Sequence, residues 1–237
     1  MKFVLDTHCH TISSGHAYST ISEYISQAQN KNLELIAITD HAPKMPGSCG
    51  EFYFGNIKIL PKKFDNLEVW YGSELNIIDY EGNVDLPEHI LKNLDIVIAS
   101  YHPPCLEPLE DNTQTIMKVM SNPYVNVLGH PGDPRILFDI PKVVAFAKKT
   151  GTILEINNSS LNPNSTRFGG VDIIKNIIAE CKKISWPIIL GSDAHFHLDL
   201  ANFDSVKDLV KDLPDELILN TSVELFKKYI GKKKIGL

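Results

Sequence analysis

Short apolar stretches recur along the whole chain and alternate with segments of helical pattern. Seven such stretches, each four to six residues long and rich in Ile, Val and Leu, occupy positions 2–6, 35–39, 68–73, 95–100, 126–129, 152–156 and 187–191. Continuous apolar runs of this length are typical of strands covered on both faces, as in parallel sheets. The pattern therefore predicts seven buried strands.

Apolar residues at helical spacing fill most of the intervals between these strands. Thr20 and Glu23 have the spacing of a capping box, and Tyr24, Ile25 and Ala28 follow on one helical face. Further helices are expected at 88–93, 113–120, 141–149, 171–183, 205–213 and 222–229. Pro and Gly residues make 42–67 a long loop with one turn of helix, and 76–87 fits a small hairpin.

The alternation of strands and helices fixes the expected fold class. Parallel strands joined by helices require right-handed crossovers, which predicts an α/β protein. A single domain over residues 1–237 is expected, because one α/β barrel of this length is ordinary. We favour a distorted seven-stranded (β/α) barrel of the TIM type over an open sheet, since polar residues follow nearly every strand and a barrel gathers all strand ends at one face.

Pairs of polar residues two positions apart end the first and last strands. His8 and His10 follow one strand, and Asp193 and His195 follow the other. Residues i and i+2 of an extended chain point to the same side, and imidazole and carboxylate are the ligands that borderline divalent metals prefer. Strand ends also place His41, Glu74, His102 and His130, and His16 lies in the first loop. These nine side chains exceed the needs of one ion and suit two or three.

Arginine is rare in this chain, and its two occurrences lie where a substrate is expected. Arg135 and Arg167 follow the fifth and sixth predicted strands, whereas all other fixed positive charges are lysines. Guanidinium binds phosphate bidentately, so both arginines are candidates for substrate contact, the alternative being salt bridges within their loops.

Composition and charge limit the classes of molecule that this chain is expected to bind. A formal charge of −6 argues against stable binding of nucleic acid or of acidic membranes, although bound divalent ions would make the pocket itself attract anions. Because no apolar run approaches the roughly 20 residues of a membrane span and the start reads as a strand, neither a span nor a signal peptide is expected. Four cysteines without CxxC spacing predict reduced thiols in a cytoplasmic protein.

Six segments of the chain combine polar residues with their neighbours, and they are Asp6-Thr-His-Cys-His-Thr11, Ser13-Ser-Gly-His-Ala-Tyr-Ser-Thr20, Ile38-Thr-Asp-His41, Gly129-His-Pro-Gly132, Glu155-Ile-Asn-Asn-Ser-Ser160 and Gly191-Ser-Asp-Ala-His195. In this order they resemble the polymerase and histidinol phosphatase (PHP) superfamily, most closely its YcdX-type phosphatases. The resemblance implies a distorted (β/α)7 barrel with a trinuclear metal centre. It assigns His8, His10, Glu74 and Asp193 to one ion. It assigns Glu74, His102 and His130 to a second, and His16, His41 and His195 to a third.

The expected reaction is hydrolysis of small phosphomonoesters. Clustered divalent ions, here expected to be zinc with manganese or iron as alternatives, polarise phosphate oxygens and lower the pKa of a bridging water so that hydroxide attacks phosphorus. Asp193 is the candidate to move the proton. Neither a GxSxG elbow nor a P-loop occurs in the sequence, so no other nucleophile is indicated.

Several alternatives stay open from the sequence. Histidinol phosphate and short oligonucleotides are rival substrates within the superfamily, and an amidohydrolase or a non-enzymatic metal store are rivals outside it. An amidohydrolase typically bridges its metals with a carboxylated lysine, whereas no lysine stands at a strand end here. Cys9 is expected to pack rather than to ligate, His197 to lie at the rim and His89 to take no part. The sequence leaves the number of copies in an assembly open.

Overall fold

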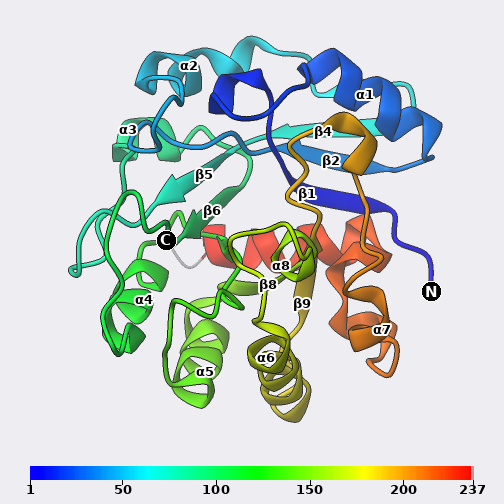
Figure 1. Cartoon of the computed structure of the whole chain (residues 1–237). Helices are drawn as coiled ribbons and strands as arrows, with labels where there is room; N and C mark the ends of the chain where they lie inside the picture. Colours follow the sequence, from blue (N-terminus) through cyan, green and yellow to red (C-terminus); the bar gives the residue numbers. More distant parts are fainter. Residues whose placement is uncertain (236–237) are drawn as a thin grey trace.

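Two sheets of mainly parallel strands meet edge to edge in the computed structural model, which describes residues 1–235 (Figure 1). The first sheet has the order β1-β2-β4-β3, in which only β3 is antiparallel to its neighbour, and the second has the order β5-β6-β7-β8-β9. The strands are β1 Leu5–Cys9, β2 Leu35–Ile38, β3 Lys63–Phe64, β4 Leu67–Tyr71, β5 Ser73–Asn76, β6 Val97–Ser100, β7 Val127–Leu128, β8 Ile153–Asn157 and β9 Ile188–Gly191.

Two isolated bridges join the sheets into a closed ring. Cys9 pairs with Ala194 beyond β9, and His41 beyond β2 pairs with Glu74 in β5. β4 and β5 are two halves of one strand interrupted at Gly72, where a Cβ would lie 2.1 Å from the carbonyl oxygen of Ile96. The ring therefore has seven parallel strand positions, and the predicted distorted (β/α)7 barrel is confirmed.

The helices surround this ring, with α4 to α7 beside the second sheet and α1 to α3 on the side of the first (Figure 1). They are α1 Ile21–Asn30, α2 Glu51–Asn56, α3 Glu88–Leu91, α4 Thr113–Met120, α5 Ile140–Thr150, α6 Val171–Lys183, α7 Lys207–Val210 and α8 Val223–Ile235. The helices predicted at 113–120 and 171–183 are confirmed to the residue. No helix within residues 1–235 is long and apolar enough to cross a membrane.

The strand ends differ from the predicted ones in a way that matters for the site. β1 begins at Leu5 and ends at Cys9, three residues later than expected at both ends, and the Val4 N–H just before it donates to the Asn220 carbonyl (2.8 Å). His8 therefore lies inside β1. Glu74 likewise lies inside β5, paired with Ile98, instead of beyond a strand end. Strand pairing thus fixes the backbone of Glu74, whereas His8 lies where the register of β1 against β2 shifts between Asp6 and Cys9.

The connection between β2 and β4 is more ordered than the loop predicted at 42–67. It contains α2, a 3-10 turn at Ile57–Ile59 and the short strand β3. In the opposite sense, the helix predicted at 205–213 is reduced to the four residues of α7. These differences concern connections and leave the strand order unchanged.

Candidate metal centre

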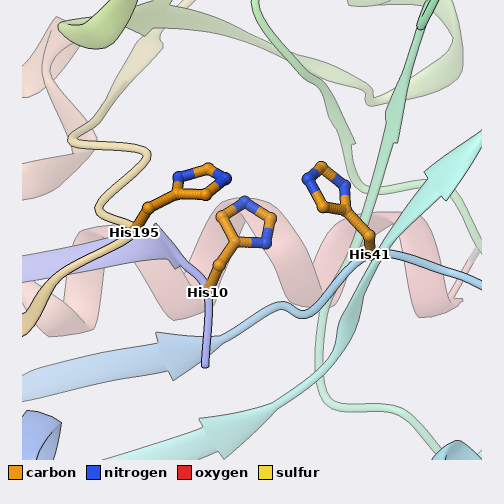
Figure 2. A group of neighbouring side chains, drawn as sticks. All are labelled: His10, His41 and His195. Atoms are coloured by element: carbon orange, nitrogen blue, oxygen red, sulfur yellow. The ribbon is translucent and has the colours of Figure 1, made fainter. Parts of the chain in front are cut away.

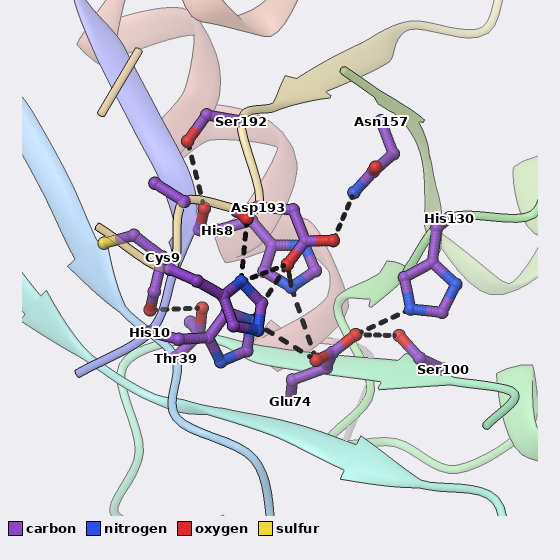
Figure 3. Close-up of polar contacts among 12 residues, drawn as sticks. His8, Cys9, His10, Thr39, Glu74, Ser100, His130, Asn157, Ser192 and Asp193 are labelled. Carbon is purple, nitrogen blue, oxygen red and sulfur yellow. Dashed lines mark hydrogen bonds and ion pairs between the residues drawn. The ribbon is translucent and has the colours of Figure 1, made fainter. Parts of the chain in front are cut away.

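Glu74 lies at the centre of the predicted ligands, which the barrel brings together from several strands (Figure 3). Its Oε2 is 2.8 Å from His41 Nδ1, 3.4 Å from His8 Nε2 and 3.5 Å from His10 Nε2. Its Oε1 is 2.9 Å from His130 Nε2 and accepts a hydrogen bond from Ser100 (2.6 Å). Both oxygens therefore face imidazoles, as a bridging carboxylate must.

Asp193 provides the second carboxylate from the turn after β9. Its Oδ1 lies 3.2 Å from His10 Nε2 and 3.6 Å from His8 Nε2. The residue has a φ of +55°, a left-handed conformation that is uncommon for a residue other than glycine. Backbone strain of this kind is frequent at functional sites, where the surrounding structure holds it.

His16 and His195 form the open side of the cluster. The His16 ring centroid lies 4.9 Å from those of His41 and His195, and the His16 side chain is exposed. Figure 2 shows the imidazoles of His10, His41 and His195 pointing toward one another. The cluster thus grades from fully buried side chains at β1 to the partly exposed His195 and the exposed His16 at the rim, so a small molecule can reach it from one face.

The donor atoms of this cluster fit divalent cations. Three sets of side chains each bring one ligand atom within 4.8 Å of the others: His10, His41 and His195; His8, His10 and Asp193; and His41, Glu74 and His102. Four buried polar atoms among the described side chains have no hydrogen-bond partner, and they are His8 Nε2, His10 Nε2, His41 Nδ1 and Glu74 Oε2. Burying unpartnered polar atoms is costly, and bound cations would satisfy all four.

Outer hydrogen bonds determine which ring nitrogen of two further histidines faces the cluster. Asn76 Nδ2 donates to the Asp85 carboxylate (2.6 Å) and to the Ala42 carbonyl (3.2 Å), so its Oδ1 must face His102 Nδ1 at 2.7 Å. His102 Nδ1 therefore donates, and its Nε2 is left with a lone pair. His195 Nδ1 likewise lies 3.0 Å from the Asp193 carbonyl and must donate to it.

Ser14 does the same for His10. Its hydroxyl donates to Asp40 (2.7 Å) and accepts the backbone N–H of His41 (3.0 Å). Because that hydroxyl proton is used, His10 Nδ1 donates to the Ser14 oxygen at 3.2 Å. The Nε2 lone pair of His10 then points at Glu74 and Asp193, as metal ligation requires.

Glu155 is the functional residue that sequence reasoning missed. Its Oε1 lies 2.6 Å from His8 Nδ1, deep inside the barrel. The sequence offered two signals, a lone carboxylate within the apolar run 152–156 and its place at the start of the family-like segment 155–160, but its partner is far away along the chain. Buried charges are rare unless they are paired, so a carboxylate within a buried strand indicates a partner on another strand.

The electrostatics of the cluster follow from burial and mutual contact. Burial raises the pKa of the Glu74 carboxyl, but His8, His102 and His41 outweigh this and hold it well below its usual range. Asp193 is lowered in the same way, first by Arg167 and then by His8. Burial and the neighbouring His41 and His195 lower the pKa of His16 to about 4.

Two of the buried imidazoles, those of His10 and His102, favour the neutral form. Burial together with His41 and His195 lowers the pKa of His10 well below its usual value, and burial also lowers that of His102. His8 is the exception, because the carboxylates of Glu155, Glu74 and Asp193 overcome the effect of burial and raise its pKa. Ionised carboxylates beside neutral imidazoles are the protonation states in which these groups bind metal.

The two arginines lie in different surroundings. Arg167 forms an ion pair with Asp193, and its Nε donates to Ser160 Oγ (3.2 Å). Arg135 lies in the loop after β7 and is held by Asp133, with Nε 2.9 Å from Oδ1 and NH2 2.6 Å from Oδ2. Arg167 thus touches the cluster directly, whereas Arg135 forms the salt bridge within its loop that the sequence left as an alternative.

Three further residues have the surroundings that were expected of bystanders. Cys9 is fully buried, and its Sγ donates to the Ala37 carbonyl (3.1 Å). His197 lies at the rim with Nδ1 2.9 Å from Ser19 Oγ. His89 is exposed on α3.

Known proteins resemble this chain along its whole length. A probable phosphatase of Thermoanaerobacter sp. (strain X514) is 49% identical over 239 residues, which cover 99% of this chain and 97% of the relative. A probable phosphatase of Acetivibrio thermocellus is 45% identical, with 99% and 98% covered. The solved structure of histidinol phosphate phosphatase from Lactococcus lactis subsp. lactis, complexed with zinc, L-histidinol and phosphate, shares the fold at a TM-score of 0.61 and 20% identity, covering 87% of this chain and 92% of that one.

A family model locates the same signal within the chain. The model of the PHP domain matches residues 6–142, which is more than half of the chain and includes His8, His41, Glu74 and His130. The full-length relatives extend the likeness over the segment that contains Asp193 and His195. The chain therefore belongs to the PHP domain family.

Proposed function

We propose that this protein is a metal-dependent phosphatase of small phosphomonoesters. The observation that carries the proposal is the set of four buried, unpartnered donor atoms that face one another around Glu74. Such a set fits bound cations, and cations beside an open face fit an anionic substrate. The names of the full-length relatives, which are probable phosphatases, support the same reaction.

Three divalent ions are proposed, with zinc as the first choice and manganese or iron as alternatives. One ion would be held by His8, His10, Glu74 and Asp193, and a second by Glu74, His102 and His130. The third would be held by His16, His41 and His195. The short distances between Glu74 Oε1 and both His130 Nε2 (2.9 Å) and His102 Nε2 (3.4 Å) support the second set. Because Asp193 and His195 lie beyond residue 142, we also propose that residues 1–237 act as one PHP domain.

When bound, the ions would polarise the phosphate oxygens and supply hydroxide near neutral pH. Arg167 would bind a non-bridging phosphate oxygen from the rim, as would Arg135 once released from Asp133. Asp193 would accept the proton of the attacking water at Oδ2, which faces Arg167 and lies 3.4 Å from Asn157 Nδ2. A bond from the water oxygen to phosphorus would form as the ester P–O bond breaks, and the proton taken up by Asp193 would pass to the leaving alkoxide.

The test is to measure metal content and turnover on one sample. Protein purified without added metal is analysed by mass spectrometry and assayed on a chromogenic aryl phosphate, histidinol phosphate and a short oligonucleotide. About three ions per chain are expected, with turnover lost on chelation and in His10→Ala. The exposed His89 provides the matched control, since His89→Ala should keep both metal and activity.

The same panel separates the alternatives. Preference for histidinol phosphate or for the oligonucleotide would keep the metal centre and change the substrate. Stoichiometric metal without turnover of any ester would overturn the phosphatase proposal in favour of an amidohydrolase or a metal store. Absence of metal in every preparation, including after incubation with Zn²⁺, would overturn the metal centre itself.

A further inference from the structure

Glu155 on β8 is buried against two of the proposed ligands without belonging to any proposed ligand set. Only 2% of its surface is exposed. Its Oε1 lies 2.6 Å from His8 Nδ1. Its Oε2 accepts the backbone N–H of His130 (2.7 Å) and one N–H of the Asn157 amide (3.1 Å).

All three partners of this carboxylate must be donors. The backbone N–H of His130 and the NH₂ group of Asn157 can only donate hydrogen bonds. A carboxylate opposite His8 Nδ1 can only accept, so it favours the imidazole that carries a proton on Nδ1. In the neutral form that binds a cation, the Nε2 lone pair of His8 then points toward Glu74 Oε2 (3.4 Å) and Asp193 Oδ1 (3.6 Å). Glu155 therefore determines which nitrogen of His8 is available to a cation.

The second oxygen acts on the other side of the cluster. His130 has a φ of +29°, which is unfavourable for a side chain with a Cβ. The hydrogen bond from its N–H to Glu155 holds this conformation, and it is the conformation that brings His130 Nε2 to 2.9 Å from Glu74 and 3.2 Å from His102 Nε2. One carboxylate thus contacts His8 and His130, which belong to two different proposed ion sites.

The neighbouring strand leaves room for this carboxylate and for little else. Gly191 on β9 lies beside it, and a Cβ at Gly191 would stand 1.8 Å from Glu155 Oε1. β8 and β9 are paired at Glu155 and Ile189, so neither backbone can move away easily. The position of Oε1 is therefore set by the sheet and by the absence of a side chain at residue 191.

From this geometry we infer that Glu155 is a positioning residue that couples two of the three ion sites. It orients the imidazole of His8 with one oxygen and the backbone of His130 with the other. The inference rests on the proposed metal centre. Loss of the carboxylate should weaken the two buried sites together and leave the site of His16, His41 and His195 unchanged. Loss of a hydrogen bond behind a metal-ligating histidine typically lowers metal affinity about 10- to 100-fold.

Glu155→Gln is the first variant, because glutamine keeps the shape but not the two acceptors. Because each oxygen of Glu155 accepts from a donor, the NH₂ group of the glutamine would face another donor, either His8 Nδ1–H or the His130 N–H. The metal-free, full-length protein is examined by long-range ¹H–¹⁵N NMR, in which His8 should be protonated at Nδ1 in the wild type and lose or shift that proton in the variant. Zn²⁺ titration against a competing chelator should show two sites weakened about 10-fold or more. Glu34→Gln, at an exposed position, is the matched control.

Gly191→Ala provides a second way to break the contact between Glu155 and His8 if Glu155→Gln does not fold. It keeps the carboxylate and pushes Oε1 away from His8, so the same loss of affinity is expected. Wild-type affinity at all three sites together with an unchanged His8 Nδ1–H signal in a folded variant would overturn the inference. Failure of the wild type itself to bind Zn²⁺ would overturn the proposed metal centre, and the NMR signal of the metal-free protein would still decide the role of Glu155.

Discussion

The chemistry of single residues in this site depends on groups that contact no substrate. Glu155, Ser14 and Asn76 each lie opposite the Nδ1 atom of one histidine and leave its Nε2 free. The candidate ligands could be proposed from the sequence, because the spacing of two residues in an extended chain is a local property. Their outer partners could not be predicted, because they come from other strands and only the closed barrel brings them within hydrogen-bond distance.

Asn76 provides a test at this scale with an isosteric change. Its NH₂ donates to Asp85 Oδ2 (2.6 Å) and the Ala42 carbonyl (3.2 Å), so Asn76→Asp would place a carboxylate oxygen against two acceptors. We expect a loss of about 2–4 kcal/mol in the free energy of unfolding at pH 7, as for an unpaired buried charge. Urea denaturation measures it. In the matched change Asn93→Asp, an exposed amide that donates to the His89 carbonyl, the loss should stay below about 1 kcal/mol. Equal losses in the two variants would contradict the argument.

At the scale of elements, the start of α1 connects helix formation to the rim of the site. Thr20 Oγ1 accepts the Glu23 N–H (3.3 Å), and Glu23 Oε2 accepts the Thr20 N–H (2.7 Å), which confirms the capping box predicted from the sequence. The preceding Tyr18 N–H donates to the His195 carbonyl (2.8 Å). Local motifs such as this one could be predicted because all their atoms lie within one turn of chain.

Removing the cap should cost stability without touching the cluster. Thr20→Ala is expected to lower the free energy of unfolding by about 1 kcal/mol, because the Glu23 N–H loses its side-chain acceptor and the Glu23 carboxylate loses the Thr20 hydroxyl. Ser26→Ala is the control on the same helix, where the hydroxyl only bonds back to the Ser22 carbonyl, and it should change stability by less than about 0.5 kcal/mol. Thermal unfolding of both variants decides, and a Ser26→Ala loss as large as that of Thr20→Ala would be evidence against the cap.

An ion pair between β4 and α8 gives an element-scale pH dependence. Partial burial raises the pKa of Glu68, but Lys227 and the Trp70 indole N–H (2.6 Å) outweigh it and lower the pKa below its usual value. A lowered pKa means that the stabilisation is complete above the unfolded-state value, about 4.3, and disappears as the pH falls through the folded-state value. Glu68→Gln should therefore be less stable than the wild type by up to about 1 kcal/mol at pH 7. Urea denaturation at a series of pH values should show the difference closing in acid; a difference independent of pH would exclude this pair as its source.

At the scale of the whole molecule, the sequence predicted the seven parallel strand positions but not β3, the division of one strand into β4 and β5, or how the ring closes. Apolar runs are local and could be read directly. The interruption of one strand at Gly72 and the bridge between Cys9 and Ala194 depend on contacts between distant segments. The seam of the ring is the place where β1 meets β9 and the segment that follows it, at the bridge between Cys9 and Ala194. Closure there matters for function, because it brings His8 and His10 on one side of the seam against Asp193 and His195 on the other. Stability of the seam and binding of metal should therefore be linked.

Asn220 is the residue that tests this link, since its buried amide joins the two strands at the seam. Its Nδ2 donates to the carbonyls of Leu5 (3.1 Å) and Leu190 (2.9 Å), and its Oδ1 accepts the Leu190 N–H (2.7 Å). Asn220→Ala leaves these backbone groups unpartnered, so we expect a loss of about 3 kcal/mol, or roughly 10 °C in Tm for a chain of this size. Asn164→Ala, at an exposed position, should leave Tm nearly unchanged.

Metal should restore part of what Asn220→Ala removes. A ligand that binds only the folded state adds about 2.7 kcal/mol at a hundred times its Kd. Thermal unfolding with and without Zn²⁺ should therefore show a rise in Tm for both the wild type and the variant. The variant should need more Zn²⁺ for the same rise, because opening of the seam separates the candidate ligands of β1 from those that follow β9. A variant that loses stability yet binds Zn²⁺ with unchanged affinity would show that the seam and the metal centre are independent, and that the ligands are held by their own strands alone.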